Sequence, residues 1–371
     1  MADTAPSAAG TLPGAAAGDS IPALQHQQTD ELPIEAASEE GDSDEFDPQE
    51  GFETRSTGST SACSSVFAHT YEHGRRYHHF KNGRYPIPND NDEQSREDMK
   101  HAMMLELMDG KLFYAPIGDT PQMILDIGTG TGEFFCLSVA FFGLEPADER
   151  ISCEIVGDRY PSARVRGIDL APIQPGWLPP NVDFLVDDCE KDFLTEDCDL
   201  VHFRFMGIIM KRPAVILENA YRSLRPGGYI EFQELCAEPL CDDDTMPPND
   251  PVKLMYDTAI RAFARFGANV LMAKDLERPL REAGFVNVQR VVKKVPIGTW
   301  ARDKTLRLIG LYQRTAVLDL MPALAGRPFE GLGMTQVESQ VLLAHARRAL
   351  NDVSVHRYFN YYFWIAQRPG D

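Results

Sequence analysis

An apolar run that leads directly into alternating glycines is the feature that most constrains this chain. Residues 123–128 form a short apolar segment of the kind that makes a strand buried on both faces, and Gly130 and Gly132 follow Gly128 at every second position. Glycines allow a sharp turn and let the backbone approach a ligand where a side chain would block it. The sequence therefore predicts a buried strand followed by a ligand-binding loop.

Four more apolar runs repeat the strand pattern further along the chain. They are residues 163–170, 182–188, 199–203 and 228–235. A helical stretch that is stopped by Pro226 and two glycines separates the last two runs. Strands that alternate with helices imply crossover connections, so we predict an α/β fold with a doubly wound, mostly parallel sheet.

Helical segments are predicted on both sides of this alternation. A helix with an acidic start and a glycine stop is expected within residues 92–110. The expected elements after Pro251 are helices at 252–266, 273–283, 304–325 and 336–351, a strand at 286–298 and an aromatic last strand at 356–367. We expect one domain over residues 63–371, with cap elements at about 64–110 and 304–351.

The first 62 residues differ from the rest in composition. Residues 1–54 contain no Lys or Arg and 13 Asp or Glu, which account for most of the formal net charge of -20. Such a segment has too few large apolar residues to offset its ordering entropy, so we expect a disordered acidic tail. It is either a solvated spacer or an interaction tail, and its carboxylates argue against nucleic-acid binding.

Several classes of protein are disfavoured by the sequence. No apolar run reaches the length of about 18 residues that a membrane span needs, and the first residues lack the features of a secretory signal. Seven scattered cysteines without a C-x-x-C pair are typical of reduced thiols. His78 and His79 have no partners at metal-ligand spacing. We expect an intracellular protein, cytoplasmic or nuclear, without a metal site.

The glycine loop favours a sulfur nucleoside over a dinucleotide. It consists of Asp126, Gly128, Gly130 and Gly132, and a dinucleotide fingerprint would have its third glycine one position later, at Glu133. The loop therefore indicates S-adenosylmethionine as the cofactor. A nicotinamide-dependent dehydrogenase is the weaker alternative.

Acidic residues at the ends of the next two strands are expected to complete the cofactor site. Asp169 is predicted to accept hydrogen bonds from the ribose hydroxyls. Asp188 is predicted to accept from the adenine amino group, with Asp187 as the alternative. For either aspartate taken alone, a loop that is acidic only because it is solvated is the competing interpretation.

The spacing before Asp169 is unusually long. Asp169 follows Gly132 by 37 positions, whereas a spacing of about 20 is usual for a comparable acidic residue. Residues 133–150 contain most of the surplus, which is a lengthened helix, a loop or a gene-model error. Glu154 would satisfy the usual spacing, but no second strand follows it, so Asp169 is preferred.

Long motifs in a fixed order make the chain resemble the LaeA-like methyltransferases of filamentous fungi over about residues 66–370. The matching segments are residues 74–78, 85–90, 109–118, 125–132, 167–181, 186–190, 220–234 and 355–362. The resemblance implies a class I methyltransferase fold with seven strands, of which the last is antiparallel, and helices on both faces. It also implies either a tailoring enzyme of secondary metabolism or a regulator that acts through protein partners. The insertion after Gly132 departs from the family pattern.

Methyl transfer is an in-line displacement, so positioning and water exclusion can supply most of the catalysis. An oxygen or nitrogen acceptor can still need a base, and His202 near the end of the fourth strand is the candidate. A histidine packed under the strand is the alternative. Tyr77 and Arg76 are predicted to close over the cofactor, with a buried aromatic cluster as the competing interpretation.

Two distant segments are predicted to roof the acceptor pocket. They are the aromatic arm at residues 71–85 and the helical block at 304–325. The side chains expected to face the acceptor are Leu306, Leu308, Ile309, Leu311 and Tyr312. This arrangement implies a largely apolar small-molecule acceptor, unless the helical block only packs on the back of the sheet.

Overall fold

A computed structural model describes residues 33–36, 69–72, 74–78, 86–132, 156–174 and 178–370 of the chain. The predicted insertion at 133–150 and the alternative ribose ligand Glu154 lie outside these residues. Most of the predicted tail lies outside them as well.

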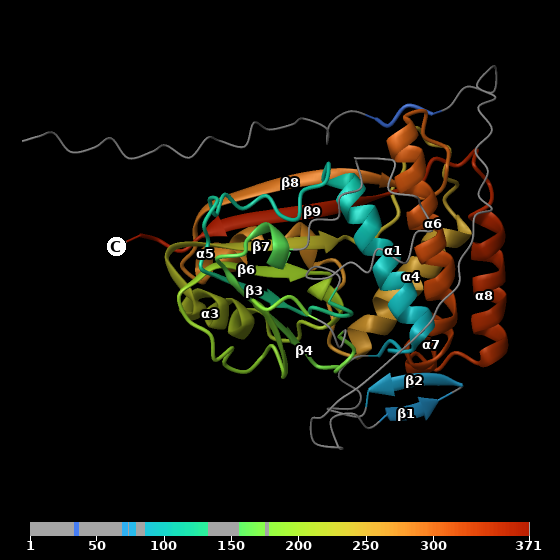
Figure 1. The fold of residues 1–371 in the computed structure, drawn as a ribbon. Coiled ribbons are helices and arrows are strands. Elements are labelled where there is room, and N and C mark those ends of the chain that lie inside the picture. The colour runs from blue at the N-terminus through green and yellow to red at the C-terminus, as the bar shows by residue number, and fades with distance from the viewer. Residues whose placement is uncertain are drawn as a thin grey trace, which may run out of the picture.

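A seven-stranded sheet forms the centre of the domain (Figure 1). Its strands are β3 (Met123–Ile127), β4 (Arg164–Asp169), β5 (Val182–Val186), β6 (Cys198–Arg204), β7 (Leu224–Leu235), β8 (Val286–Pro296) and β9 (Tyr358–Gln367). The strand order is β5-β4-β3-β6-β7-β9-β8, and β9 alone runs antiparallel to its neighbours. The predicted sheet, including its antiparallel last strand, is confirmed.

Apolar contacts cover the sheet on both faces. On one face α3 (Pro213–Ser223) and α5 (Glu277–Glu282) pack against residues such as Phe203 and Phe232, whose rings stack 4.4 Å apart. On the other face α2 (Val156–Arg159) and the segment from Leu112 to Ala115 pack against Ile124 and neighbouring side chains. This double covering explains why the strands read as continuous apolar runs.

The remaining helices gather at one end of the sheet, beyond the carboxyl ends of the parallel strands (Figure 1). They are α1 (Asn91–Leu107), α4 (Pro251–Arg265), α6 (Lys304–Ala325), α7 (Arg327–Gly331) and α8 (Gln336–Ala349). These helices share a second apolar core with the ends of β8 and β9. We call this group of helices the cap.

One predicted helix, at residues 273–283, is wrong as a single element. The chain instead forms a 3-10 turn at Met272–Lys274 and then α5. Pro279 lies in the first turn of α5, where proline is best tolerated, which favours a helix start at Glu277.

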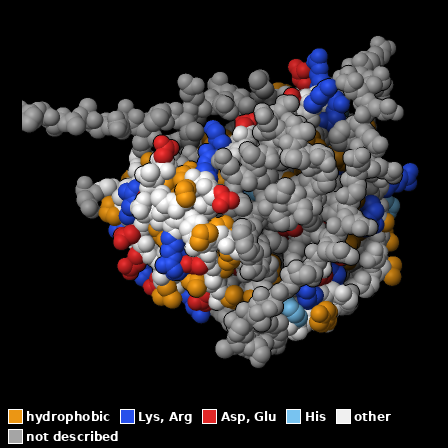
Figure 2. Space-filling model, viewed as in Figure 1, with side chains coloured by type: hydrophobic (Ala, Val, Ile, Leu, Met, Phe, Trp, Pro, Cys, Tyr) orange, Lys and Arg blue, Asp and Glu red, His pale blue; other side chains and the backbone are white. Residues whose placement is uncertain are grey.

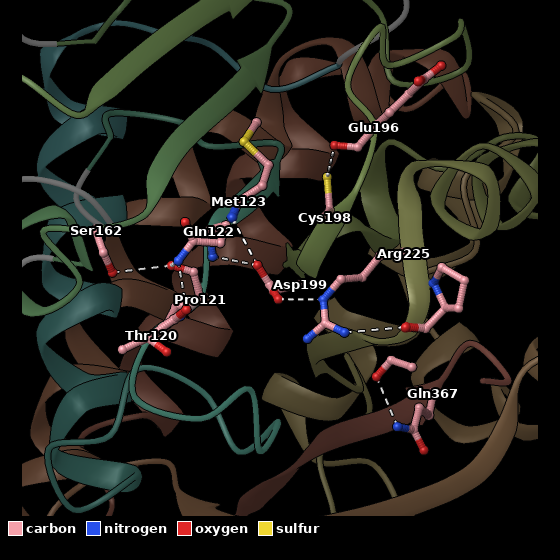
Figure 3. Close-up of polar contacts among 12 residues, drawn as sticks. Thr120, Pro121, Gln122, Met123, Ser162, Glu196, Cys198, Asp199, Arg225 and Gln367 are labelled. Atoms are coloured by element: carbon pink, nitrogen blue, oxygen red, sulfur yellow. Dashed lines mark hydrogen bonds and ion pairs between the residues drawn. The ribbon is translucent and has the colours of Figure 1, made fainter. Parts of the chain in front are cut away.

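A buried carboxylate aligns the amino ends of three strands (Figure 3). Asp199, at the start of β6, accepts hydrogen bonds from the backbone N–H groups of Gln122 (2.6 Å) and Met123 (3.0 Å) and from Nε of Arg225 (2.6 Å). These donors belong to the starts of β3 and β7. A single side chain therefore ties the starts of the three strands together.

Two N-terminal segments pack against the cap. The hairpin of β1 (His69–Glu72) and β2 (Arg75–His78) is held by paired hydrogen bonds from Arg327 to Glu72, both 2.6 Å. Residues 33–36 lie against Ala301, where the backbone N–H of Arg302 donates to the carbonyl of Glu35 (2.7 Å). Disorder was predicted there, but Ile34 and Ala36 bury apolar surface on the cluster around Trp300.

Charge is mixed over the sheet half of the described surface. In Figure 2 acidic and basic side chains alternate there with apolar ones. Within the described ranges, no helix combines the length and apolar character needed to span a bilayer. Concentrated charge is found instead inside the domain, at the carboxyl edge of the sheet.

Candidate functional site

A cavity of about 200 Å³ lies where the carboxyl ends of β3, β4, β6 and β7 face the cap. Open α/β sheets bind ligands at this edge. The glycine-loop half of the cavity is lined by residues 128–131, 168–171 and 187. The cap half is lined mainly by apolar side chains, among them Ile87, Tyr256, Ile260, Phe263, Val317 and Leu320.

The glycine loop has a backbone that only glycine adopts readily. Gly128 and Gly130 have φ values of +75° and +57°. A Cβ atom on Gly128 would overlap the sulfur of Met206, and one on Gly130 would lie 3.1 Å from Oε2 of Glu97. The backbone of the loop therefore packs closely against the side chains of Met206 and Glu97.

Asp169 connects the glycine loop to the end of β4. Its carboxylate accepts from the backbone N–H groups of Gly130 and Ala171, both at 2.8 Å. Burial raises the pKa of Asp169 to about 6, although these two hydrogen bonds favour the charged form. The structure thus places the predicted ribose ligand on the cavity wall.

Only some of the predicted cofactor residues line the cavity. Gly128, Gly130, Asp169 and Asp187 line it, whereas Asp126, Gly132 and Asp188 do not. Asp188 is turned toward its own loop, where its Oδ1 accepts from the N–H of Glu190 (3.0 Å). The predicted alternative, Asp187, is therefore the aspartate that the structure brings to the wall.

The candidate base His202 is enclosed in the sheet. It is fully buried, and its Nδ1 lies 2.7 Å from Oδ1 of Asp126, its register partner on β3. Its register partner on β7 is Glu231, whose carboxylate accepts from the N–H groups of Tyr114 and Ala115. His202 is not part of the cavity wall. This placement matches the alternative interpretation, a histidine packed within the sheet.

Tyr77 and Arg76 are also absent from the cavity wall. The ring of Tyr77 is buried under the guanidinium of Arg327, 3.9 Å from the ring centre. Arg76 donates to the backbone carbonyl of Asn89 (2.6 Å). Tyr77 thus packs against α7, whereas Arg76 holds the chain that enters α1 and brings Ile87 and Asn89 to the wall.

The largest set of residues that the sequence did not identify lies on α1. Its charged or polar wall residues are Glu93, Gln94, Arg96, Glu97, Lys100 and His101. Positions three, four and seven apart share one face of a helix, so this stripe is visible in the sequence. Charge at that spacing is also the pattern of a solvated helix face, which is why it gave no signal for a site.

Side chains of α1 bind both the glycine loop and the end of β6. Oγ1 of Thr131 donates to Asp98 (2.9 Å), whose pKa burial raises to about 6. Nη2 of Arg204 lies 2.8 Å from Nδ1 of His101. Burial and the nearby Arg204 lower the pKa of His101 well below its usual value. His101 is therefore a neutral imidazole with its proton on Nε2.

Several buried polar atoms on the wall make no hydrogen bond within the described part of the chain. They are both amide atoms of Asn89, Oγ1 of Thr129, Oε2 of Glu93 and Nε2 of His101. Buried polar atoms are normally paired, and each exception calls for an explanation. A ligand that offers both donors and acceptors would satisfy them.

The cap half is formed by α4 and by the middle of α6. From α6 the wall residues are Gln313, Ala316, Val317 and Leu320. The predicted set of Leu306, Leu308, Ile309, Leu311 and Tyr312 does not line the cavity. The prediction of the helix was right and that of its face was wrong, because Ile309 packs into the cap core and Leu306 packs near Trp300.

Known proteins resemble this chain in sequence and in fold. A family model described as a methyltransferase domain matches residues 98–290. The methyltransferase pytC of Aspergillus terreus is 36% identical, over 84% of this chain and 91% of its own length. The secondary metabolism regulator LAE1 of Cochliobolus heterostrophus is 32% identical, over 80% of this chain and 94% of its own.

Among solved structures, a phosphoethanolamine N-methyltransferase 2 from Haemonchus contortus, in complex with S-adenosyl-L-methionine, aligns with 72% of this chain. The TM-score is 0.38 and the sequence identity 17%. The chain spans about half of that structure, covering 52% of it.

Proposed function

The chain belongs to the LaeA-like methyltransferases, and from that premise we propose that it binds S-adenosylmethionine in the glycine-loop half of the cavity and transfers the methyl group to a largely apolar small molecule of fungal secondary metabolism. One observation carries this proposal. A single cavity joins a glycine-lined, polar half to an apolar half at the carboxyl edge of the sheet.

The residues present fit the cofactor. S-adenosylmethionine offers ribose hydroxyls, an adenine amino group and charged amino-acid groups. Asn89, Thr129 and His101 on the wall have buried donors and acceptors with no hydrogen-bond partner among the described residues. In this proposal Asp169 accepts from the ribose hydroxyls and Asp187 lies at the adenine end. The ligand would lie against the backbone of Gly128 and Gly130, which line the cavity.

The chain's own contribution is to hold the reactants in line and to keep water out. When bound, the cofactor supplies a methyl carbon that is activated for displacement. Residues 205–207 separate the two halves, and Glu234 fixes this turn by accepting from the N–H groups of Met206 (2.7 Å) and Gly207 (3.3 Å). The apolar side chains of α4 and α6 exclude water from the acceptor.

His202 has a structural role in this proposal. Its contact with Asp126 and its position between β3 and β7 support the polar layer inside the sheet. If the methyl acceptor must be deprotonated, we expect the general base among the charged residues of the cavity wall.

A regulator that acts through protein partners is the second candidate function. It is favoured by the relative LAE1, which is named as a regulator of secondary metabolism. Both candidates bind the same cofactor, and both are placed in the cytoplasm or nucleus, where the free thiols of Cys189, Cys198, Cys236 and Cys241 would stay reduced. Turnover of S-adenosylmethionine with an apolar acceptor would distinguish the enzyme from the regulator.

Isothermal titration tests the cofactor assignment. The full chain is titrated with S-adenosylmethionine, S-adenosylhomocysteine and NAD. We expect both sulfur nucleosides to bind and NAD to fail. Binding of NAD alone would assign the glycine loop to a dehydrogenase and reject the proposal.

A further inference from the structure

Lys100 occupies an unusual position on the cavity wall. It is 8% exposed, and its ammonium makes no hydrogen bond or ion pair to any residue that the structure describes. Its Nζ lies 3.3 Å from the ring centre of Phe205, in the turn that separates the two halves of the cavity. Apart from this ring, a buried ammonium with no anion or hydrogen-bond acceptor beside it is costly unless a ligand pairs with it.

The other wall cations already have partners. Nε of Arg96 donates to Oε1 of Glu93 (3.0 Å), and Nη2 of Arg204 contacts His101. Lys100 is therefore the cation of the described wall that is available to a ligand.

The groups that face Lys100 are compatible with an incoming anion. They are Glu93, Arg96 and Glu97 from α1 and Glu234 from β7. Burial raises the pKa of Glu97 to about 8 and that of Glu234 to about 7, so both carboxyls resist ionisation near neutral pH. Burial lowers the pKa of Lys100 to about 7, and a bound anion would favour its protonated form.

We propose that Lys100 binds an acidic oxygen of the methyl acceptor, so that the acceptor is a largely apolar molecule with a carboxylic acid, phenol or enol group. This inference rests on the proposed function and specifies its substrate class. The apolar body of the acceptor would occupy the cap half, against Tyr256, Phe263 and Val317. The acidic oxygen would then lie at the boundary with the cofactor.

The contacts of Lys100 place it with the acceptor and not with the cofactor. Glu97 of α1 lies near the Cβ position of Gly130, and the nearby Asp169 contributes to the raised pKa of Glu97. Lys100 is one turn further along the helix and lies over Phe205, which packs against the cap core and meets Tyr361 edge to face (6.2 Å). Glu97 therefore approaches the glycine loop, whereas Lys100 lies over the turn at the boundary with the cap half.

Three naphthalene probes of similar shape and different charge test the inference. The full chain, saturated with S-adenosylhomocysteine, is titrated with 2-naphthoate, 2-naphthamide and 2-naphthylmethylamine. We expect 2-naphthoate to bind at least about tenfold more tightly than the amide, the scale of a charge-assisted hydrogen bond. Lys100→Met should remove this preference and keep amide binding, while Lys100→Arg should retain it.

Lys111→Met is the matched control, since Lys111 also lies over an aromatic ring, 5.8 Å from the centre of Tyr114, but is exposed outside the cavity. It should change nothing. Preference for the amine, no binding of 2-naphthoate, or a preference that survives Lys100→Met would each overturn the inference. A tenfold loss of S-adenosylhomocysteine affinity in Lys100→Met would instead make Lys100 a cofactor ligand. Failure of the wild type to bind S-adenosylhomocysteine would reject the proposed function itself.

Discussion

Buried polar groups at the two ends of the sheet differ in their hydrogen bonding. At the amino end, Asp199 receives three hydrogen bonds that tie β3, β6 and β7 together. At the carboxyl end, Asn89, Thr129 and His101 keep buried atoms that have no partner in the described chain. Complete pairing contributes stability, whereas incomplete pairing leaves hydrogen-bonding capacity for a ligand. One sheet thus separates stability and ligand binding by position along its strands.

The largest expected effect is a loss of cofactor binding at the carboxyl end of the sheet. Gly130→Val should weaken S-adenosylhomocysteine binding at least about 100-fold, because the new side chain would enter the space between the loop and Glu97. Isothermal titration measures the loss.

Gly118→Val controls for backbone strain in that experiment. Gly118 has a similar positive φ, +77°, but open space around its Cβ position. Its variant should bind normally. Equal losses in the two variants would show that strain, and not the cavity, explains the effect.

The second effect is a loss of stability at the amino end of the sheet. Asp199→Ala should lower the free energy of unfolding by about 3 kcal/mol, because buried donors lose their acceptor. Urea denaturation measures this change, and cofactor affinity should stay within about twofold. Asp183→Ala, at a more exposed ion pair with Arg164 and Arg166, should cost under about 1 kcal/mol. A large loss of affinity in Asp199→Ala would contradict the separation of tasks.

The third effect concerns Asp169. Asp169→Ala should reduce S-adenosylhomocysteine binding by roughly 1.5 to 3 kcal/mol, the scale of hydrogen bonds to a charged group. Unchanged affinity, together with a loss in Glu154→Ala, would transfer the ribose role to Glu154.

The raised pKa of Asp169 makes both cofactor affinity and stability depend on pH. In the proposed site the ionised carboxylate accepts hydrogen bonds from the ribose hydroxyls, so cofactor affinity should rise as pH increases through about 6, and Asp169→Asn should abolish this rise. The effect on stability has the opposite sign. The folded pKa lies above the ordinary value of 3.8, so the folded state binds more protons, and the contribution of Asp169 falls between about pH 4 and 6.

The smallest effect concerns the N-terminal segment. Removal of residues 1–32 should leave the melting temperature unchanged, and removal of residues 1–36 should cost at most about 1 kcal/mol through the contacts of Ile34 and Ala36. Differential scanning calorimetry compares the two truncations. A large drop in the shorter truncation would contradict the proposal that residues 1–32 do not pack on the domain.

Local patterns predicted most of the fold. Apolar runs marked β3 to β7, and the helical period located α6 at Lys304–Ala325, the bounds that the structure has. The face of α6 that meets the cavity depends on how α1, α7 and α8 pack around it, and no single-helix pattern contains that information.

The site was harder to predict than the fold. Gly128, Gly130 and Asp169 could be predicted from the sequence, because glycines after a strand and an acidic residue at a strand end have few other structural roles. His202 could not be placed, because alternation along a strand gives two faces without saying which one meets a cavity. The charged stripe on α1 could not be distinguished from a solvated face until its helix was seen to cover the glycine loop.

Hydrogen exchange with and without S-adenosylhomocysteine compares the two ends of the sheet in one experiment. The ligand should slow amide exchange at residues 128–131, 169–171 and 96–101, the segments that contribute most of the polar cavity wall. Exchange at Gln122 and Met123 should not change, since their backbone N–H groups already donate to Asp199. Unchanged exchange at the carboxyl end, or protection confined to the amino end, would contradict the assignment of the cofactor site.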